Sequence, residues 1–316
     1  MAEPTVTDVV NPDVVAARDA LGGVAHTPGV AKPTPLLVAD GVRRTFGGVN
    51  AVDVEHLEVQ SNVITALIGP NGAGKTTFFN LMTGFDRPDA GSWTFGGKSL
   101  AGVPASRVSK SGMVRTFQLT KALSRMTVLE NMRLGARDQV GEGMGAALLR
   151  PLWRKQEKEI TDKARDLLVR FKLDAKEKDF AGSLSGGQRK LLEMARALMS
   201  DPTLVMLDEP MAGVNPALTQ SLLGHITALR DSGTSVLFVE HDMHMVRHIS
   251  DWVVVMAEGK VVAEGPPKEV MDDQAVIDAY LGSHHDTDLG DDSLLEEESV
   301  ISAEAAAELE AEEEAK

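Results

Sequence analysis

The chain has 316 residues, 43% of them hydrophobic, and no cysteine, so it can build a sizeable core in one or two domains but no disulfide or thiolate metal site. Of the net charge of −15, residues 286–316 carry −12, from thirteen acidic residues and one lysine, which leaves −3 for the body. That balance argues against nucleic acid as a partner, because phosphate backbones select basic surfaces.

The sequence gives no sign of a membrane-spanning segment or of a secretion signal. It has no run of about 18 uncharged apolar residues. Its first residues lack the basic and then apolar layout of a signal peptide. We therefore expect a cytoplasmic location.

Residues 1–34 are rich in Pro, Gly and Ala and have few large apolar side chains. Asn11 as N-cap, Pro12 at the first helical position and glycines at positions 22 and 23 predict one short helix here. We expect the rest of residues 1–34 to form a flexible arm.

Alternating apolar and polar residues predict strands over residues 35–40 and 49–59, with a turn at Gly47 and Gly48. Phe46 stands just before that turn. Its ring could stack on an adenine base, or it could be a core side chain of a small sheet. Both interpretations are open at this point.

The apolar residues 63–68 predict a buried strand, and a glycine-rich stretch after them opens a helix. Strand, glycines, lysine and hydroxyl together indicate a phosphate-binding loop, whose backbone N–H groups point at an anion. The helix N-terminus adds partial positive charge. Lys75 can reach the β- and γ-phosphates, and the Thr76 hydroxyl suits Mg²⁺. The predicted nucleotide-binding residues of this loop are Gly69, Pro70, Asn71, Gly72, Ala73, Gly74, Lys75, Thr76 and Thr77.

After this helix, residues 92–95 predict a short strand, and residues 114–118 predict a strand end that delivers Gln118 into a loop. Residues 119–184 are predicted to form a helical block. A later part of it has apolar residues at helical spacing, namely Ile160, Ala164, Leu167, Leu168 and Phe171. Residues 150–178 hold ten cationic and six acidic residues, which favours a solvated face; proximity to anionic lipid is the alternative.

Ser185, Gly186, Gly187 and Gln188 come directly before a predicted helix. Ser185 suits an N-cap, and the two glycines leave the helix N-terminus open to an anion. Taken alone, this stretch is better explained as a cap without a ligand.

Two further apolar strands end in polar residues. Residues 203–207 lead to Asp208 and Glu209, and residues 235–239 lead to Glu240 and His241. Parallel sheets place ligands at the carboxyl ends of their strands. Asp208 therefore suits Mg²⁺, Glu209 suits a base that orients water, and His241 can donate to a phosphate oxygen.

Toward the C-terminus, a helix is predicted from Pro216 to about residue 230 and a hairpin over residues 252–264. Short helices follow to residue 282. Residues 283–316 are acidic, and we expect charge repulsion to keep this tail disordered.

Taken in order, these motifs resemble the ATP-binding-cassette ATPases over residues 35–282, about four-fifths of the chain. Four stretches look like the ATPases of branched-chain amino acid importers: residues 114–118 (Val-Arg-Thr-Phe-Gln), 127–131 (Thr-Val-Leu-Glu-Asn), 209–216 (Glu-Pro-Met-Ala-Gly-Val-Asn-Pro) and 240–243 (Glu-His-Asp-Met). Related lipopolysaccharide-export ATPases usually have aspartate where Asn215 stands. Residues 1–34 and 283–316 lie outside the family pattern.

The resemblance implies a role for each position. Phe46 would stack on adenine, and the phosphate loop would hold the phosphates of ATP. Thr76, Gln118 and Asp208 would attend Mg²⁺, Glu209 would activate water, and His241 would contact the γ-phosphate. Ser185, Gly186, Gly187, Gln188 and Asn215 would act across a dimer interface, on the nucleotide of the partner subunit.

The resemblance also implies an architecture: an α/β RecA-like P-loop ATPase core, an antiparallel β subdomain and a helical subdomain at about residues 119–184. Two such subunits would sandwich two ATPs at the cytoplasmic face of the membrane. They would work with two permease subunits and an extracytoplasmic solute-binding protein. The alternatives are the ATPase of a urea or other small-solute importer, a soluble cassette protein without transport function, and a nucleotide sensor, which the presence of Glu209 opposes.

Overall fold

The computed structural model describes residues 10–116, 123–140, 150–214 and 216–282. Within them the elements run in the following order: α1 (Pro12–Leu21), β1 (Pro35–Phe46), β2 (Val49–Gln60), β3 (Ile64–Ile68), α2 (Lys75–Met82), β4 (Ala90–Phe95), β5 (Lys98–Ser99), α3 (Ala105–Lys110), β6 (Met113–Arg115), α4 (Val128–Arg133), α6 (Arg150–Arg170), η2 (Asp174–Lys176), η3 (Ala181–Ser183), α7 (Gly186–Leu198), β7 (Leu204–Asp208), α8 (Pro216–Asp231), β8 (Ser235–Val239), α9 (Met243–Ile249), β9 (Trp252–Ala257), β10 (Lys260–Gly265), α10 (Pro267–Met271) and α11 (Gln274–Gly282).

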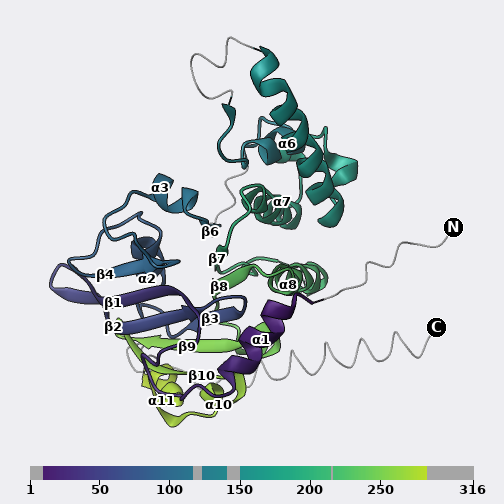
Figure 1. The fold of residues 1–316 in the computed structure, drawn as a ribbon. Helices are drawn as coiled ribbons and strands as arrows, with labels where there is room; N and C mark the ends of the chain where they lie inside the picture. The colour runs from purple at the N-terminus through teal and green to yellow at the C-terminus, as the bar shows by residue number, and fades with distance from the viewer. Residues whose placement is uncertain (1–9, 117–122, 141–149, 215, 283–316) are drawn as a thin grey trace, which may run out of the picture.

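Two sheets organise the chain (Figure 1). The larger has the order β10-β9-β3-β8-β7-β6, with parallel neighbours throughout except for the antiparallel pair β9–β10. The smaller is antiparallel, in the order β2-β1-β4-β5. In Figure 1 the helices α6 and α7 stand beyond the β6–β7 edge of the larger sheet, away from β1 and β2. This is the three-part layout that the sequence predicted.

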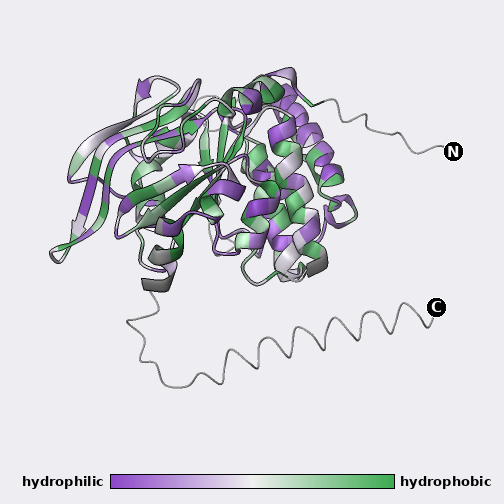
Figure 2. Ribbon diagram, turned by 90° about the horizontal axis from the view of Figure 1, so that it is seen from below, coloured by the Kyte–Doolittle hydropathy of each residue, from purple (hydrophilic) through white to green (hydrophobic). Residues whose placement is uncertain are grey.

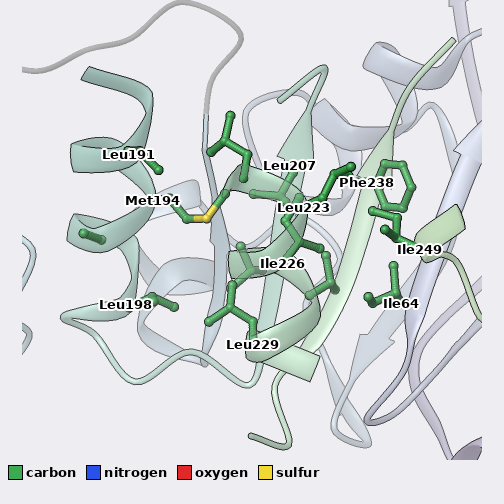
Figure 3. Close-up of a cluster of buried hydrophobic side chains, with 14 of the residues drawn as sticks. Ile64, Leu191, Met194, Leu198, Leu207, Leu223, Ile226, Leu229, Phe238 and Ile249 are labelled. Atoms are coloured by element: carbon green, nitrogen blue, oxygen red, sulfur yellow. The ribbon is translucent and has the colours of Figure 1, made fainter. Parts of the chain in front are cut away.

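The central strands are buried on both faces, as their continuous apolar runs predicted. Successive side chains in a strand point to opposite faces, so alternate residues of these strands belong to two different hydrophobic clusters, one on each face of the sheet. One face packs with α7 and α8, and Figure 3 shows part of this buried cluster, which includes Met194, Leu207, Leu223, Ile226 and Phe238. The other face, which includes Leu67, Met206 and Leu237, packs with α2 and the antiparallel sheet.

The predicted apolar stripe of the helical block is confirmed. Ala164 and Leu168 of α6 and Phe171 directly after it are buried, and Ile160 and Leu167 pack partly buried against the same core. In Figure 2 the helices carry hydrophilic and hydrophobic residues side by side, as expected for amphipathic helices with one buried face. The apolar face of α6 is therefore the face that joins the helical part to the core.

The N-terminal segment differs from the expectation. The helix capped by Asn11 is confirmed, since the Asn11 side chain accepts from the Asp13 N–H. The flexible arm, however, is wrong for residues 10–34, which pack on the domain. Leu21 joins the core, Arg18 lies 2.7 Å from Asp251, and the buried Lys32 pairs with Glu264. Residues 1–9 lie outside the described residues, as does the predicted disordered tail.

Among the described residues, no helix is both long enough and apolar enough to span a membrane.

Candidate active site

The phosphate loop connects β3 to α2, and its backbone conformation requires glycine at three positions. Gly69, Gly72 and Gly74 have φ of 148°, 80° and 97°, values that side chains disfavour. Close packing adds a second requirement. A Cβ on Gly69 would lie 2.0 Å from the Met256 carbonyl oxygen, and one on Gly74 would lie 2.2 Å from the Ala51 carbonyl oxygen. The loop is therefore fixed against two neighbouring strands.

Lys75 begins α2 and is only 8% exposed. Its Nζ donates to the carbonyl oxygens of Gly69 at 2.6 Å and Pro70 at 2.9 Å. Burial lowers the pKa of Lys75, and the nearby carboxylates of Glu209 and Asp208 work in the opposite direction. Both predicted acidic residues therefore lie near the Lys75 ammonium group, beside the phosphate loop.

The C-terminal helix α11 packs against β10 and α10, and its Tyr280 lies partly buried against the main core. Burial raises the pKa of Tyr280 to about 12, and a hydrogen bond from the Gly69 backbone opposes that shift. The Tyr280 side chain of α11 therefore lies near the Gly69 backbone at the start of the phosphate loop.

Asp208 ends β7 and is held by a residue that the sequence reasoning did not single out. The Arg115 Nη2 at the end of β6 donates to Asp208 Oδ2 at 2.6 Å, and both side chains are 5% exposed. The other Arg115 nitrogen, Nη1, donates to Asn80 Oδ1 at 2.6 Å, and the guanidinium lies 5.5 Å from the Phe79 ring. Arg115 therefore ties together the strands β6 and β7 and the helix α2.

Glu209 follows in a strained backbone conformation, with φ of 45°. Its N–H donates to the Val239 carbonyl oxygen at 3.0 Å, which fixes it beside the end of β8. There Glu240 is 2% exposed, and burial raises its pKa. The next residue, His241, is exposed. The carboxylate predicted to orient water and the histidine predicted for the γ-phosphate thus follow two adjacent strands.

Phe46 lies at the end of β1 and is 47% exposed. The alternative that it is a core side chain is therefore wrong. The Arg44 guanidinium lies 4.6 Å from the centre of its ring and is itself paired with Asp86 and Asp89. An exposed ring backed by a cation leaves a surface on which a base could stack.

Ser185 caps α7 as predicted. Its hydroxyl accepts from the Gln188 N–H at 3.2 Å, and the Gln188 side chain accepts from the Ser185 N–H at 3.0 Å. Gly187 also has a packing role, since a Cβ there would lie 1.6 Å from a methyl group of Leu218. Ser185 and Gly186 are exposed.

The structure brings Lys75, Asp208 and Glu209 together, and it places Ser185 on the separate helical part (Figure 1). Gln118 and Asn215 lie outside the described residues. One feature of the sequence could have pointed to Arg115: it stands three residues before Gln118, at the end of a predicted strand.

Comparisons with known proteins agree with this geometry. The family model for ABC transporters matches residues 52–212, and that for branched-chain amino acid ATP-binding cassette transporters matches residues 260–286. The chain is 41% identical over 251 residues to the probable branched-chain amino acid transport ATP-binding protein LivG of Archaeoglobus fulgidus, covering 78% of this chain and 96% of that protein. It is 39% identical over 250 residues to the high-affinity branched-chain amino acid transport ATP-binding protein BraF of Pseudomonas aeruginosa, covering 78% and 98%.

Solved structures give the same result. A nucleotide-free ATP-binding cassette from an ABC transporter matches with a TM-score of 0.68 and 35% identity, over 78% of this chain and 98% of that chain. The ADP conformation of an ABC transporter cassette matches equally well, over 79% and 99%. The predicted RecA-like fold class is confirmed. The chain belongs to the branched-chain amino acid ATP-binding cassette transporter family and is an ATP-hydrolysing subunit of an ABC transporter.

Proposed function

We propose that this chain powers the uptake of branched-chain amino acids by binding and hydrolysing ATP. The observation that carries the proposal is that Lys75 begins the helix after β3, Asp208 ends β7 and Glu209 follows it, so that all three lie at the carboxyl-end edge of the parallel sheet. The relatives named for branched-chain amino acid transport and the matching family segment at residues 260–286 support the choice of solute.

Each residue has a distinct part in hydrolysis. The loop N–H groups and Lys75 bind the phosphates, and the Phe46 ring stacks on adenine. Glu209 orients the attacking water, and His241 donates to the γ-phosphate. Because Glu209 and His241 follow neighbouring strands, one phosphate group can reach both.

The residues also fit a Mg²⁺ ion. The Asp208 carboxylate and the exposed Thr76 hydroxyl are hard oxygen donors beside the same loop, and Gln118 would add a third. Bound with ATP, the ion offsets negative charge on the phosphates. Asp208 would hold it while the hydrogen bond from Arg115 keeps that carboxylate oriented.

We further propose that the complete site forms between two cassettes. Ser185, Gly186, Gly187 and Gln188 open a second helix N-terminus, which is exposed and separate from the phosphate loop. They would grip the nucleotide of a partner ATP-binding subunit, either an identical chain or a second ATPase, and Asn215 would cross the interface. Two permease subunits and an extracytoplasmic solute-binding protein complete the transporter, with this chain peripheral at the cytoplasmic face.

Uptake of labelled solutes tests the proposal in cells whose transport depends on this chain. We expect uptake of leucine, isoleucine or valine with the natural chain and none with Glu209→Gln. Uptake of urea in their place would overturn the choice of solute, and uptake that survives Glu209→Gln would overturn the role of hydrolysis.

A further inference from the structure

The turn formed by residues 210–212, directly after Glu209, is held from two sides. From α7, the Lys190 Nζ donates to the Pro210 carbonyl oxygen at 3.0 Å and also to the carbonyl oxygen of Ala212. From the end of β8, the Glu240 Oε1 accepts from the Met211 N–H at 3.0 Å. All three residues of the turn are thus bonded to side chains from other elements.

These contacts form in a partly buried region. Glu240 is 2% exposed. Burial lowers the pKa of Lys190, while the nearby carboxylates of Glu240, Glu193 and Glu209 oppose that shift. A small cavity beside the turn is lined by Lys190, Glu193 and Glu209 among others. The ammonium group therefore balances negative charge around the catalytic turn as well as donating to it.

The turn matters because Glu209 needs external support. A residue other than glycine at a φ of 45° is strained and persists only where its surroundings hold it. Its own N–H is fixed by Val239, and its carbonyl oxygen accepts from the Ala212 N–H at 3.2 Å. The orientation of Glu209 thus depends directly on where the turn lies.

The same contacts link two parts of the site that are separate in sequence. Lys190 lies on the helix that Ser185 caps. Glu240 immediately precedes His241, whose N–H donates to Glu240 Oε2 at 3.3 Å. The turn therefore joins the helix of the proposed partner contact to the histidine proposed for the γ-phosphate.

We propose that Lys190 and Glu240 are positioning residues that clamp the turn at residues 210–212 and hold Glu209 in its working orientation. This inference rests on the proposed role of Glu209 in hydrolysis. Neither side chain touches the reacting atoms. Their effect should therefore appear in the rate of the chemical step and leave nucleotide binding unchanged.

The first test compares three variants of the full chain. Lys190→Met removes the donor and its charge but keeps the apolar stem, and Lys190→Arg restores donors. The matched control is Lys163→Met, because the Lys163 Nζ likewise donates to a backbone carbonyl oxygen, that of Met199 at 3.0 Å, on another helix. We expect Lys190→Met to lower kcat by about ten- to hundredfold, since small misplacements of catalytic groups have effects of that size.

The other readouts separate positioning from general damage. For Lys190→Met, affinity for a fluorescent ATP analogue and the thermal unfolding temperature should match those of the natural chain. Lys190→Arg should recover most of kcat, and Lys163→Met should leave it unchanged. A parallel loss of kcat and nucleotide affinity, or an equal effect of Lys163→Met, would overturn the clamp.

Glu240 supplies a second and independent test should Lys190→Met fold poorly. Glu240→Gln keeps an acceptor for the Met211 N–H and should retain most of kcat, whereas Glu240→Met should lose it. Because both side chains hold one turn, the combined Lys190→Met and Glu240→Met changes should be clearly non-additive. Additive losses would contradict a shared clamp.

Glu209→Gln distinguishes failure of the clamp from failure of the function on which it rests. If Glu209→Gln abolishes hydrolysis while the Lys190 and Glu240 variants keep the natural kcat, the clamp is wrong and the proposed function stands. If Glu209→Gln itself hydrolyses ATP normally, the proposed function is wrong.

Discussion

Arg115 shows how one residue can hold the carboxylate that is proposed to bind the metal ion. Replacing it by methionine would leave Asp208 buried beside Lys75 without its 2.6 Å partner, at a cost to stability of about 3 kcal/mol or more. We also expect the divalent-ion concentration that supports ATP binding to rise by roughly tenfold, as for other residues that orient a ligand.

Urea denaturation and Mn²⁺ titration of Arg115→Met measure the two effects. Arg43→Met is the control, because the Arg43 side chain is 66% exposed and its pair with Asp53 should contribute below about 1 kcal/mol. Unchanged Mn²⁺ dependence in Arg115→Met would contradict the proposed role of Asp208.

Sequence patterns predicted the phosphate loop, Asp208, Glu209 and Ser185 because residue type and spacing carry their chemistry. They could not predict Arg115 or Lys190, whose importance comes from contacts across 93 and 20 positions of the chain. Phe46 required the structure too, since exposure alone decided between core and surface.

At the scale of elements, the N-terminal cap of α4 makes a pH-dependent contribution to the stability of the fold. The Thr127 hydroxyl accepts from the Glu130 N–H, and the Glu130 carboxylate accepts from the Thr127 N–H at 2.7 Å. The Thr127 N–H and the Thr127 hydroxyl, which donates to the same carboxylate oxygen at 2.9 Å, hold the pKa of Glu130 below its usual value. A depressed folded-state pKa stabilises the fold above the unfolded pKa, and this contribution is lost as pH falls through the folded pKa.

Thr127→Ala should therefore lower the free energy of unfolding at neutral pH, by an amount that shrinks as the pH falls below about 4. Thr161→Ala is the control, because the Thr161 hydroxyl donates to the Glu157 backbone oxygen and involves no titrating group. Urea denaturation at several pH values measures the loss of unfolding free energy in each variant. The same pH dependence of this loss in Thr127→Ala and Thr161→Ala would contradict the account.

The docked N-terminal segment makes a second prediction at this scale. The Lys32 Nζ lies 2.6 Å from Glu264 Oε2, with side-chain exposures of 0% and 1%, and the Trp252 indole N–H donates to the same oxygen at 2.9 Å. Lys32→Met should destabilise the fold by about 3–5 kcal/mol, because Glu264 would remain buried without its cation. Lys155→Met, at an exposed pair, should have almost no effect in the same denaturation experiment. If Lys32→Met and the natural chain unfolded at the same urea concentration, the N-terminal segment would not be held by this ion pair.

Strands and helices with strong periodicity could be predicted from the sequence, including the hairpin of β9 and β10 and the stripe of α6. The docking of residues 10–34 could not, because Lys32 and Glu264 are 232 positions apart. The six residues of α3 were missed because so short a helix carries no periodic pattern.

At the scale of the whole molecule, the proposed site is composite. Ser185→Arg would place a bulky cation at the exposed start of α7 without touching the phosphate loop. We expect ATP binding by a single chain to remain nearly unchanged, while ATP-driven dimerisation and hydrolysis are lost. Rate per molecule should also rise with concentration in the natural chain. Constant specific activity from a chain that stays monomeric in light scattering would refute the composite site.

Hydrolysis by Glu209→Gln is the most direct measurement of the central claim, that Glu209 orients the attacking water beside the phosphate loop. The change removes the carboxylate but keeps the shape of the side chain, so affinity for ATP should match that of the natural chain. Steady-state turnover should fall by about a hundredfold or more, as for loss of a general base, and the ATP-bound dimer should accumulate. Turnover at the natural rate by a folded, ATP-binding Glu209→Gln chain would contradict the claim.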